Sequence, residues 1–233
     1  MASSIPALIC DASALISITD SCFIHVLYML KRGFSGAYVM PPCVYEECVV
    51  QPRRIMADAR YALRVERAVS DEVLDVVPLA DPGDAAQILQ WANSIFTLEG
   101  RPLPILQRGE AECLALALET GVRDLLMDER TTRLLLEDPA QLTAHLQAEY
   151  GERLRVRQQP LDELMARCKT LRFYRSSEML LLAYQMGFFD DYWNMKEEAL
   201  EAALYRLKYS GCALSEDEIE QSMKLALRGK NAE

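Results

Sequence analysis

The segment ALICDASALI, residues 7 to 16, decides the fold, because a short apolar run ends in an acid just before a helix-like stretch. The segment LLMD, residues 125 to 128, repeats the first half of this pattern far downstream. A carboxylate at the carboxyl end of a buried strand is unusual, and open α/β sheets bind ligands at that edge. We therefore expect Asp11 and Asp128 to converge on one site although the chain separates them widely.

Apolar runs and helix-like stretches alternate along the first 135 residues, which favours a parallel sheet covered by helices. The patterns predict strands at 7–12, 37–40, 73–79 and 123–127, and helices at 13–31, 43–50, 54–69, 84–96 and 110–120. A Pro-rich loop is expected at 101–104. Beyond it we expect a helix near 130–148, an arginine-bearing strand at 153–157, and several helices over 160–228, the last after a capping box at Ser215.

Charge and length limit the possible classes of protein but do not identify one. The 233 residues suffice for one enlarged α/β domain or for a domain with a helical appendage. The net charge of -10 argues against a protein whose whole surface is positively charged for binding nucleic acid. An acidic site and a local basic surface can nevertheless coexist in one acidic chain.

Cysteine usage indicates a reducing compartment. The chain has seven cysteines with no CxxC pair and only two histidines, His25 and His145, so no zinc pattern is present. Buried free thiols fit better than a disulfide framework, and we expect a cytoplasmic protein. No stretch approaches the roughly 20 apolar residues of a membrane span, and the N-terminus does not resemble a signal peptide, so we expect no membrane insertion.

Two further acids join the pair at the strand ends: Glu47 in PPCVYEE, residues 41 to 47, and Glu110 in GEAE, residues 109 to 112. Neighbouring carboxylates repel by about 1 kcal/mol per pair in water and more in a cleft. Mg²⁺ or Mn²⁺ removes that cost, prefers oxygen ligands and can activate a water for phosphodiester cleavage. The four acids together predict a metal-binding hydrolytic site that needs no histidine or cysteine.

Each acid also has a simpler explanation when taken alone. Asp11 and Asp128 are placed as helix N-caps, Glu47 can be a solvated helix position, and Glu110 suits the helix dipole. Glu112 lies two residues from Glu110, so on a regular helix it points elsewhere. The metal site therefore depends on the combination.

In order and spacing, the motifs at 9–16, 39–47, 109–112 and 125–133 resemble the PIN domain. The likeness is greatest to the prokaryotic branch with a Gly-Glu-Ala-Glu segment, whose members are related to toxin ribonucleases. It covers residues 7 to about 135, and residues 180 to 227 look like the C-terminal helices of that branch. The resemblance implies a three-layer α/β/α fold with a central parallel sheet.

The same resemblance implies a Mg²⁺- or Mn²⁺-dependent ribonuclease with an acidic quartet. Its catalytic and metal-binding residues would be Asp11, Glu47, Glu110 and Asp128. Many members have Asp at the third position, and Glu112 competes with Glu110 for that role. Ser13 would correspond to a hydroxyl that bonds a ligand water or a substrate phosphate, with a helix cap as the simpler alternative.

Three regions follow from this comparison. Residues 1–135 would form the catalytic core, 136–178 an inserted, basic and largely helical segment, and 179–233 a C-terminal helical region packing on the core. Arginine grips phosphates while aromatic faces stack on unpaired bases, so the insertion is the expected contact for single-stranded RNA. The candidate substrate-binding residues besides Ser13 are Arg133, Arg153, Arg155, Arg157, Arg172 and Arg175.

The leading hypothesis is an endoribonuclease that cuts single-stranded RNA and leaves 5′-phosphate and 3′-hydroxyl ends. One alternative is a PIN-like nucleic-acid-binding or regulatory module whose chemistry has lapsed. Another is the toxin of a toxin-antitoxin pair, blocked by an antitoxin-like partner protein. A homodimer is compatible with each of them.

Overall fold

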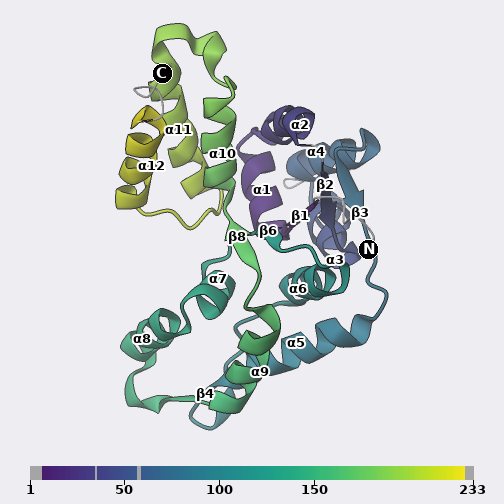
Figure 1. Ribbon diagram of the computed structural model, residues 1–233, viewed down its shortest axis with the longest axis vertical. Coiled ribbons are helices and arrows are strands. Elements are labelled where there is room, and N and C mark those ends of the chain that lie inside the picture. The colour runs from purple at the N-terminus through teal and green to yellow at the C-terminus, as the bar shows by residue number, and fades with distance from the viewer. Residues whose placement is uncertain (1–6, 35, 57–58, 229–233) are drawn as a thin grey trace.

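The central element of the fold is a five-stranded parallel sheet with helices on both sides (Figure 1). The computed structural model describes residues 7–34, 36–56 and 59–228. The strand order is β3-β2-β1-β6-β8, and every neighbouring pair is parallel. The strands are β1 Ala7–Cys10, β2 Ala37–Met40, β3 Leu74–Val76, β6 Asp124–Leu126 and β8 Arg172–Tyr174. The predicted α/β class with a central parallel sheet is confirmed.

The register of the middle strands brings the predicted strand ends together. Ile9 of β1 lies between Val39 of β2 and Leu125 of β6, and all three strands point the same way. Directly after β1, the Asp11 backbone N–H donates to the Leu126 carbonyl at 2.9 Å. The residues that follow β1 and β6 therefore lie at one edge of the sheet.

The helix predicted over 13–31 is wrong as a single helix. The structure has α1, Ala12–Asp20, and α2, Ile24–Gly33, which are bent by 111° at the break between them. Hydroxyl groups near the break bond to carbonyls inside α1, as Thr19 Oγ1 does to the Leu15 carbonyl at 2.6 Å, and Cys22 adopts a left-handed φ of 69°. Such side-chain bonds compete with the helical ladder and bend helices.

The next segment follows the prediction more closely. A short α3, Pro42–Tyr45, continues into the π-helical turn η1, Glu46–Val50, and the 3₁₀ turn η2, Pro52–Arg54. Three longer helices follow: α4 Ala59–Ser70 and α6 Arg108–Thr120 pack on the main sheet, and α5 Pro82–Ile95 packs on α6. Gly121 ends α6 in the left-handed conformation, as its place in the sequence predicts.

The helix predicted near 130–148 is also two helices, α7 Arg130–Glu137 and α8 Pro139–Tyr150. Pro139 has no N–H to continue the ladder, and the Asp138 side chain caps α8 instead. After the turn η3, Gly151–Arg153, the predicted arginine strand is present as β7, Leu154–Val156. It pairs antiparallel with β4, Phe96–Leu98, which also pairs with β5, Arg101–Pro102, where a loop was expected.

Strand β8 corrects the expectation that residues 160–228 are all helical. After α9, Gln158–Cys168, the chain enters the central sheet beside β6 rather than staying in a peripheral segment. Its side chains alternate between exposed and half-buried, so β8 has no buried apolar run that would mark it in the sequence. The end of the predicted insertion is therefore the edge strand of the main sheet.

The C-terminal helices stand together beside the β8 edge (Figure 1). They are α10 Ser176–Gln185, the 3₁₀ turn η4 Asp190–Met195, α11 Lys196–Tyr209 and α12 Glu216–Arg228. The predicted cap of the last helix is present, since the Glu218 N–H donates to Ser215 Oγ at 3.2 Å.

In the part of the chain that the structure describes, no single helix is long and apolar enough to cross a bilayer. Only α1 and α2 taken together reach that length and composition, and these two are sharply bent against each other.

Candidate active site

The Ser13 hydroxyl joins the ends of β1 and β6. Asp11 caps α1 by accepting the Ser13 N–H at 3.0 Å on Oδ2, and the same oxygen accepts the Ser13 hydroxyl at 2.6 Å. Ser13 Oγ in turn accepts the backbone N–H groups of Asp128 at 3.0 Å and Glu129 at 3.2 Å. The cap of α1 is therefore Asp11 and not Ser13, whose hydroxyl instead fixes the two strand ends relative to each other.

Glu47 lies against the N-terminus of α6. A Cβ atom placed on Gly109 would be 2.9 Å from Glu47 Oε1 and 3.0 Å from Oε2, so only glycine leaves room for this carboxylate. The Cys43 thiol donates to Glu47 Oε1 at 3.4 Å. The π-helical turn that carries Glu47 therefore delivers a carboxylate to the first turn of α6.

Glu110 and Glu112 leave α6 in different directions, as their two-residue spacing predicts. Glu110 accepts the Gln107 N–H at 2.5 Å in a capping box, and its other oxygen accepts the Thr132 hydroxyl of α7 at 2.7 Å. Glu112 accepts the Cys43 N–H at 3.2 Å and pairs with Arg108 Nε at 2.9 Å. Glu110 thus faces α7, while Glu112 faces α3 and carries its own counterion.

The two acids after β6 also diverge. Asp128 accepts the Ser176 N–H on Oδ1 at 2.8 Å and the Ser176 hydroxyl on Oδ2 at 2.6 Å. Glu129 caps α7 by accepting the Thr131 N–H on Oε1 at 3.0 Å. Asp128 therefore turns toward α10, and Glu129 turns toward the first turn of α7.

Burial and mutual repulsion make the acidic cluster costly to ionise. The exposed fractions are 3% for Asp11, 6% for Glu110 and 0% for Asp128. Burial, reinforced by the Asp11 charge, raises the pKa of Glu110 to about 7. Burial and the charges of Asp11 and Glu112 likewise raise the pKa of Glu47. The pKa of Asp11 is raised by burial, with the Asp128 charge adding to the effect.

This donor set suits a hard divalent cation, because it consists of carboxylate oxygens whose repulsion a cation would relieve. Asp11, Glu47 and Glu110 come from three separate segments and surround the N-terminus of α6. Among the residues that the structure describes, no three Asp, Glu, His or Cys side chains are already gathered as a formed metal cage.

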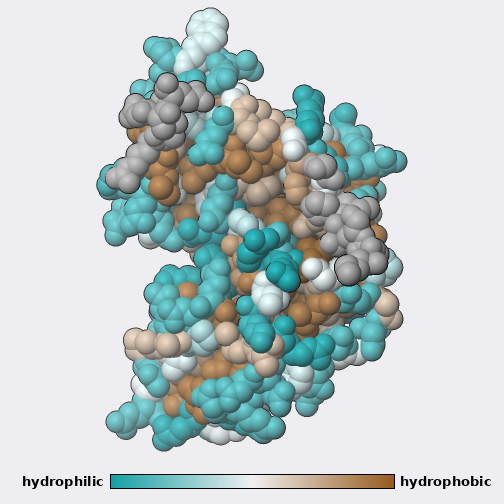
Figure 2. Space-filling view, viewed as in Figure 1, coloured by the Kyte–Doolittle hydropathy of each residue, from teal (hydrophilic) through white to brown (hydrophobic). Residues whose placement is uncertain are grey.

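A polar cavity of about 560 Å³ opens between α7–α8 and the loop before α12. Figure 2 shows the surface hollowed between the C-terminal helices and the lower half of the molecule. The cavity contains the arginines 130, 133 and 175. Arg133 pairs with Glu137 at 3.6 Å and Arg175 with Glu218 at 2.7 Å, while Arg130 is exposed.

The other candidate substrate-binding arginines do not gather around the acids. Arg153 pairs with Glu99 at 3.3 Å, and Arg172 binds both carboxylate oxygens of Asp124 at 2.6 and 2.8 Å. Arg155 and Arg157 are exposed on or beside β7. Figure 1 places the small sheet around β4 at the far lower end of the molecule, away from β1 and β6.

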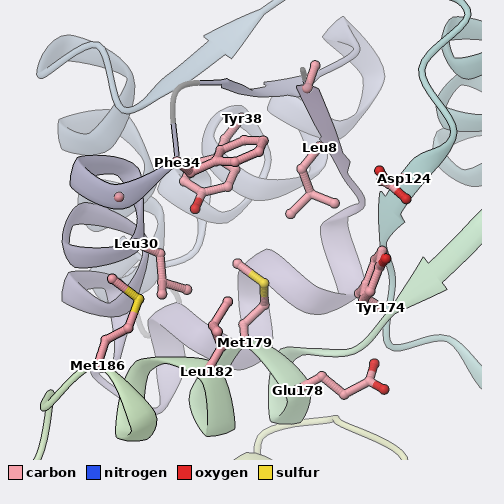
Figure 3. A pocket seen from close by; sticks show the side chains of 12 residues that line it. Leu8, Leu30, Phe34, Tyr38, Asp124, Tyr174, Glu178, Met179, Leu182 and Met186 are labelled. Atoms are coloured by element: carbon pink, nitrogen blue, oxygen red, sulfur yellow. The ribbon is translucent and has the colours of Figure 1, made fainter.

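A larger cavity, of about 610 Å³, lies at the opposite edge of the main sheet. It includes Ala7 and Asp124, which begin β1 and β6, and Figure 3 shows Leu30, Phe34 and Met179 pointing into it. Its lining is mainly apolar, so it does not share the chemistry of the acidic edge.

Several residues of the acidic edge were not indicated by the sequence. Thr132 and Ser176 hold Glu110 and Asp128, Arg108 neutralises Glu112, and Glu129 adds a fifth acid around α6 and α7. Glu129 had one visible signal, since it directly follows Asp128 and precedes a helix. The partners of the others depend on contacts between distant segments.

A family model described as a PIN domain matches residues 7–139 of the chain. No curated protein and no solved structure matches the chain in the same comparison.

Proposed function

The chain belongs to the PIN domain family, which is a nuclease superfamily, and from this premise we propose that it is a Mg²⁺- or Mn²⁺-dependent endoribonuclease that cuts single-stranded RNA. PIN nucleases generally act on nucleic acids and usually use divalent metal ions. The observation that carries the proposal is the approach of Asp11, Glu47 and Glu110, from three separate segments, to the N-terminus of α6.

Asp11, Glu47 and Glu110 would hold the metal ion. Their raised pKa values mean that the ionised cluster is costly without a counterion, and a cation would offset this cost. Glu112 suits the role less well, because Arg108 already balances its charge. When bound, the ion would activate a water and stabilise the leaving oxygen.

The proposed reaction is hydrolysis of a phosphodiester. The oxygen of a water forms a bond to phosphorus, the bond between phosphorus and the 3′ oxygen breaks, and the products carry 5′-phosphate and 3′-hydroxyl ends. The proton of the attacking water passes to a carboxylate, and the 3′ oxygen takes a proton from solvent.

Arg130, Arg133 and Arg175 line one cavity and would contact phosphates of the substrate there. Arg130 lies two positions after Asp128 in the chain, and Arg175 directly precedes Ser176, which binds Asp128. Arg155 and Arg157 offer a second, more distant contact for a longer RNA. Neutralising backbone phosphates with arginine provides affinity without sequence preference. Seven free cysteines support the proposal that the protein works in the reducing cytoplasm.

The test compares RNA cleavage by four preparations: wild type with Mn²⁺, wild type with a chelator, Asp11→Asn, and Glu46→Gln. Glu46 is an exposed neighbour of Glu47, so it controls for loss of a nearby charge. We expect wild type with Mn²⁺ and Glu46→Gln to cut single-stranded RNA, and the other two to leave it intact. Equal cutting by all four would contradict the proposal.

A separate measurement addresses the lapsed-enzyme alternative. RNA binding that falls steeply with salt, in a protein that does not bind Mn²⁺, would favour a nucleic-acid-binding module without chemistry. We expect wild type to bind Mn²⁺ instead.

A further inference from the structure

The end of β6 carries two consecutive acids that serve different parts of the molecule. Resting on the proposed nuclease function, we infer that Glu129, rather than Asp128, completes the group of metal-binding carboxylates. Asp128 acts as a positioning residue that ties the C-terminal helices to the end of β6.

The surroundings of Asp128 do not suit a metal ligand. Its side chain is completely buried, and Ser176 engages both carboxylate oxygens, one through its backbone N–H and one through its hydroxyl. Glu110 is also hydrogen-bonded on both oxygens, but its partners Gln107 and Thr132 lie at the starts of α6 and α7. To reach an ion beside α6, Asp128 would have to turn away from α10 and leave the Ser176 donors unpaired. Losses of this kind are among the larger costs in a folded protein.

Glu129 has the opposite orientation. Its backbone is extended, with φ of −63° and ψ of 115°, and successive side chains of an extended segment point to opposite sides. With Asp128 turned toward α10, Glu129 is therefore turned toward the other acids. Its side chain is half-buried, so a hydrated cation can reach it.

Contacts around Glu129 place it next to Glu110 and Asp11. Its backbone N–H donates to Ser13 Oγ, whose hydroxyl proton goes to Asp11. Its carboxylate caps the turn of α7 in which Thr132 donates to Glu110. Glu129 is thus connected to Asp11 through Ser13 and to Glu110 through the first turn of α7.

Electrostatics agrees with this placement. The charge of Glu129 raises the pKa of Glu110 in addition to the larger effects of burial and of Asp11. Mg²⁺ and Mn²⁺ keep several waters and take only a few protein carboxylates, so a half-exposed acid at the rim of a buried cluster is a suitable ligand.

The roles of Glu129 and Asp128 can be separated by substitutions that each change one local contact or charge. Glu129→Gln keeps an oxygen that can cap α7, and it removes the charge. Ser176→Ala releases Asp128 from one hydrogen bond and leaves its carboxylate in place. Glu137→Gln, at the exposed end of α7, is the matched control for charge loss on the same helix.

The experiment measures Mn²⁺ affinity by calorimetry and stability by urea unfolding without metal, for wild type, Asp11→Asn, Asp128→Asn, Glu129→Gln, Ser176→Ala and Glu137→Gln. We expect Glu129→Gln to weaken Mn²⁺ binding by roughly tenfold or more, since even disturbing outer partners of metal ligands costs about 10- to 100-fold. Its urea midpoint should match wild type. Asp128→Asn and Ser176→Ala should lower the urea midpoint and leave the Mn²⁺ affinity of the folded protein unchanged.

The opposite pattern would overturn the inference: normal Mn²⁺ binding by Glu129→Gln, with binding lost in Asp128→Asn. If Asp128→Asn does not fold, normal Mn²⁺ binding by Glu129→Gln alone is sufficient to overturn it. Asp11→Asn separates this outcome from failure of the proposed function. If wild type and Asp11→Asn bind Mn²⁺ equally or not at all, the nuclease proposal itself fails.

Discussion

Ser176 holds the Asp128 carboxylate with two hydrogen bonds, from its N–H to Oδ1 at 2.8 Å and from its hydroxyl to Oδ2 at 2.6 Å. The pair is buried and joins the end of β6 to the first turn of α10, across 48 positions of the chain. The C-terminal helices are thereby attached directly to the edge of the sheet that carries the acidic cluster.

Replacing Ser176 by Ala should destabilise the protein by about 1.5–3 kcal/mol, the usual worth of a hydrogen bond to a charged group. The free energy of unfolding in urea measures the effect. Ser94→Ala removes a hydroxyl that donates only to the Trp91 carbonyl at 2.9 Å, so its loss should cost less. An equal loss of unfolding free energy in both variants would mean that the hydrogen bond to Asp128 stabilises the protein no more than an ordinary one.

Gly109→Ala should disturb the site without weakening the fold. The added Cβ would meet the end of the flexible Glu47 side chain, so the carboxylate moves rather than the backbone. Alanine favours a helix over glycine by up to about 1 kcal/mol, and stability should not fall. Mn²⁺ affinity should fall by roughly tenfold, the lower end of what disturbed metal ligation costs.

The control for this prediction is a double-mutant cycle with Glu47→Ala. Once the Glu47 carboxylate is gone, adding Gly109→Ala should have no further effect on Mn²⁺ binding. A full additional loss would show that Gly109 acts through something other than Glu47.

The placement of Asp11 and Asp128 after neighbouring parallel strands was predictable from sequence because each signal is local. An apolar run that stops at an acid marks the end of a buried strand, and parallel strands end at one edge. The order of the four motifs then identified the family that the match over residues 7–139 confirms.

Strand β8 and the orientation of Asp128 could not be predicted for one physical reason, which is their dependence on distant contacts. Strand β8 pairs with β6 after an excursion of more than 40 residues, and its half-exposed side chains carry no buried pattern. The orientation of Asp128 depends on Ser176 in the same way. Two adjacent acids look equivalent in a sequence until the segment that binds one of them is known.

Glu110 should make the stability of the metal-free protein fall as pH rises. Its pKa is raised from 4.5 to about 7 in the folded state, so the folded protein holds this proton more tightly than the unfolded chain does. Below pH 4.5 both states are protonated and the group has no effect on stability. Between 4.5 and 7 the unfolded chain loses the proton first, and folding becomes less favourable by up to a few kcal/mol, at about 1.4 kcal/mol per pKa unit.

Urea unfolding of wild type and Glu110→Gln with a chelator, below pH 4.5 and above pH 7, tests this expectation. Glutamine does not titrate, so the free energy of unfolding of Glu110→Gln should decline less over that interval. The constant cost of replacing the capping carboxylate cancels in the comparison between the two pH values. A parallel decline in both proteins would show that Glu110 ionises normally.

Arg130 and Arg157 should differ in the length of RNA for which they matter. Arg130, two positions after Asp128, lines the cavity between α7–α8 and the loop before α12, whereas Arg157 follows β7 at the far end of the molecule. With Asp11→Asn as the background to prevent cleavage, Arg130→Ala should weaken binding of both a short and a long single-stranded RNA. For each RNA, the slope of log binding affinity against log salt concentration should become shallower by about 0.7, which is the contribution of one phosphate contact.

Arg157→Ala should affect the long RNA only, because a short strand held at the acids does not reach the small sheet. A loss of short-strand binding in Arg157→Ala, with none in Arg130→Ala, would place the RNA on the small sheet instead of in the cavity that Arg130 lines.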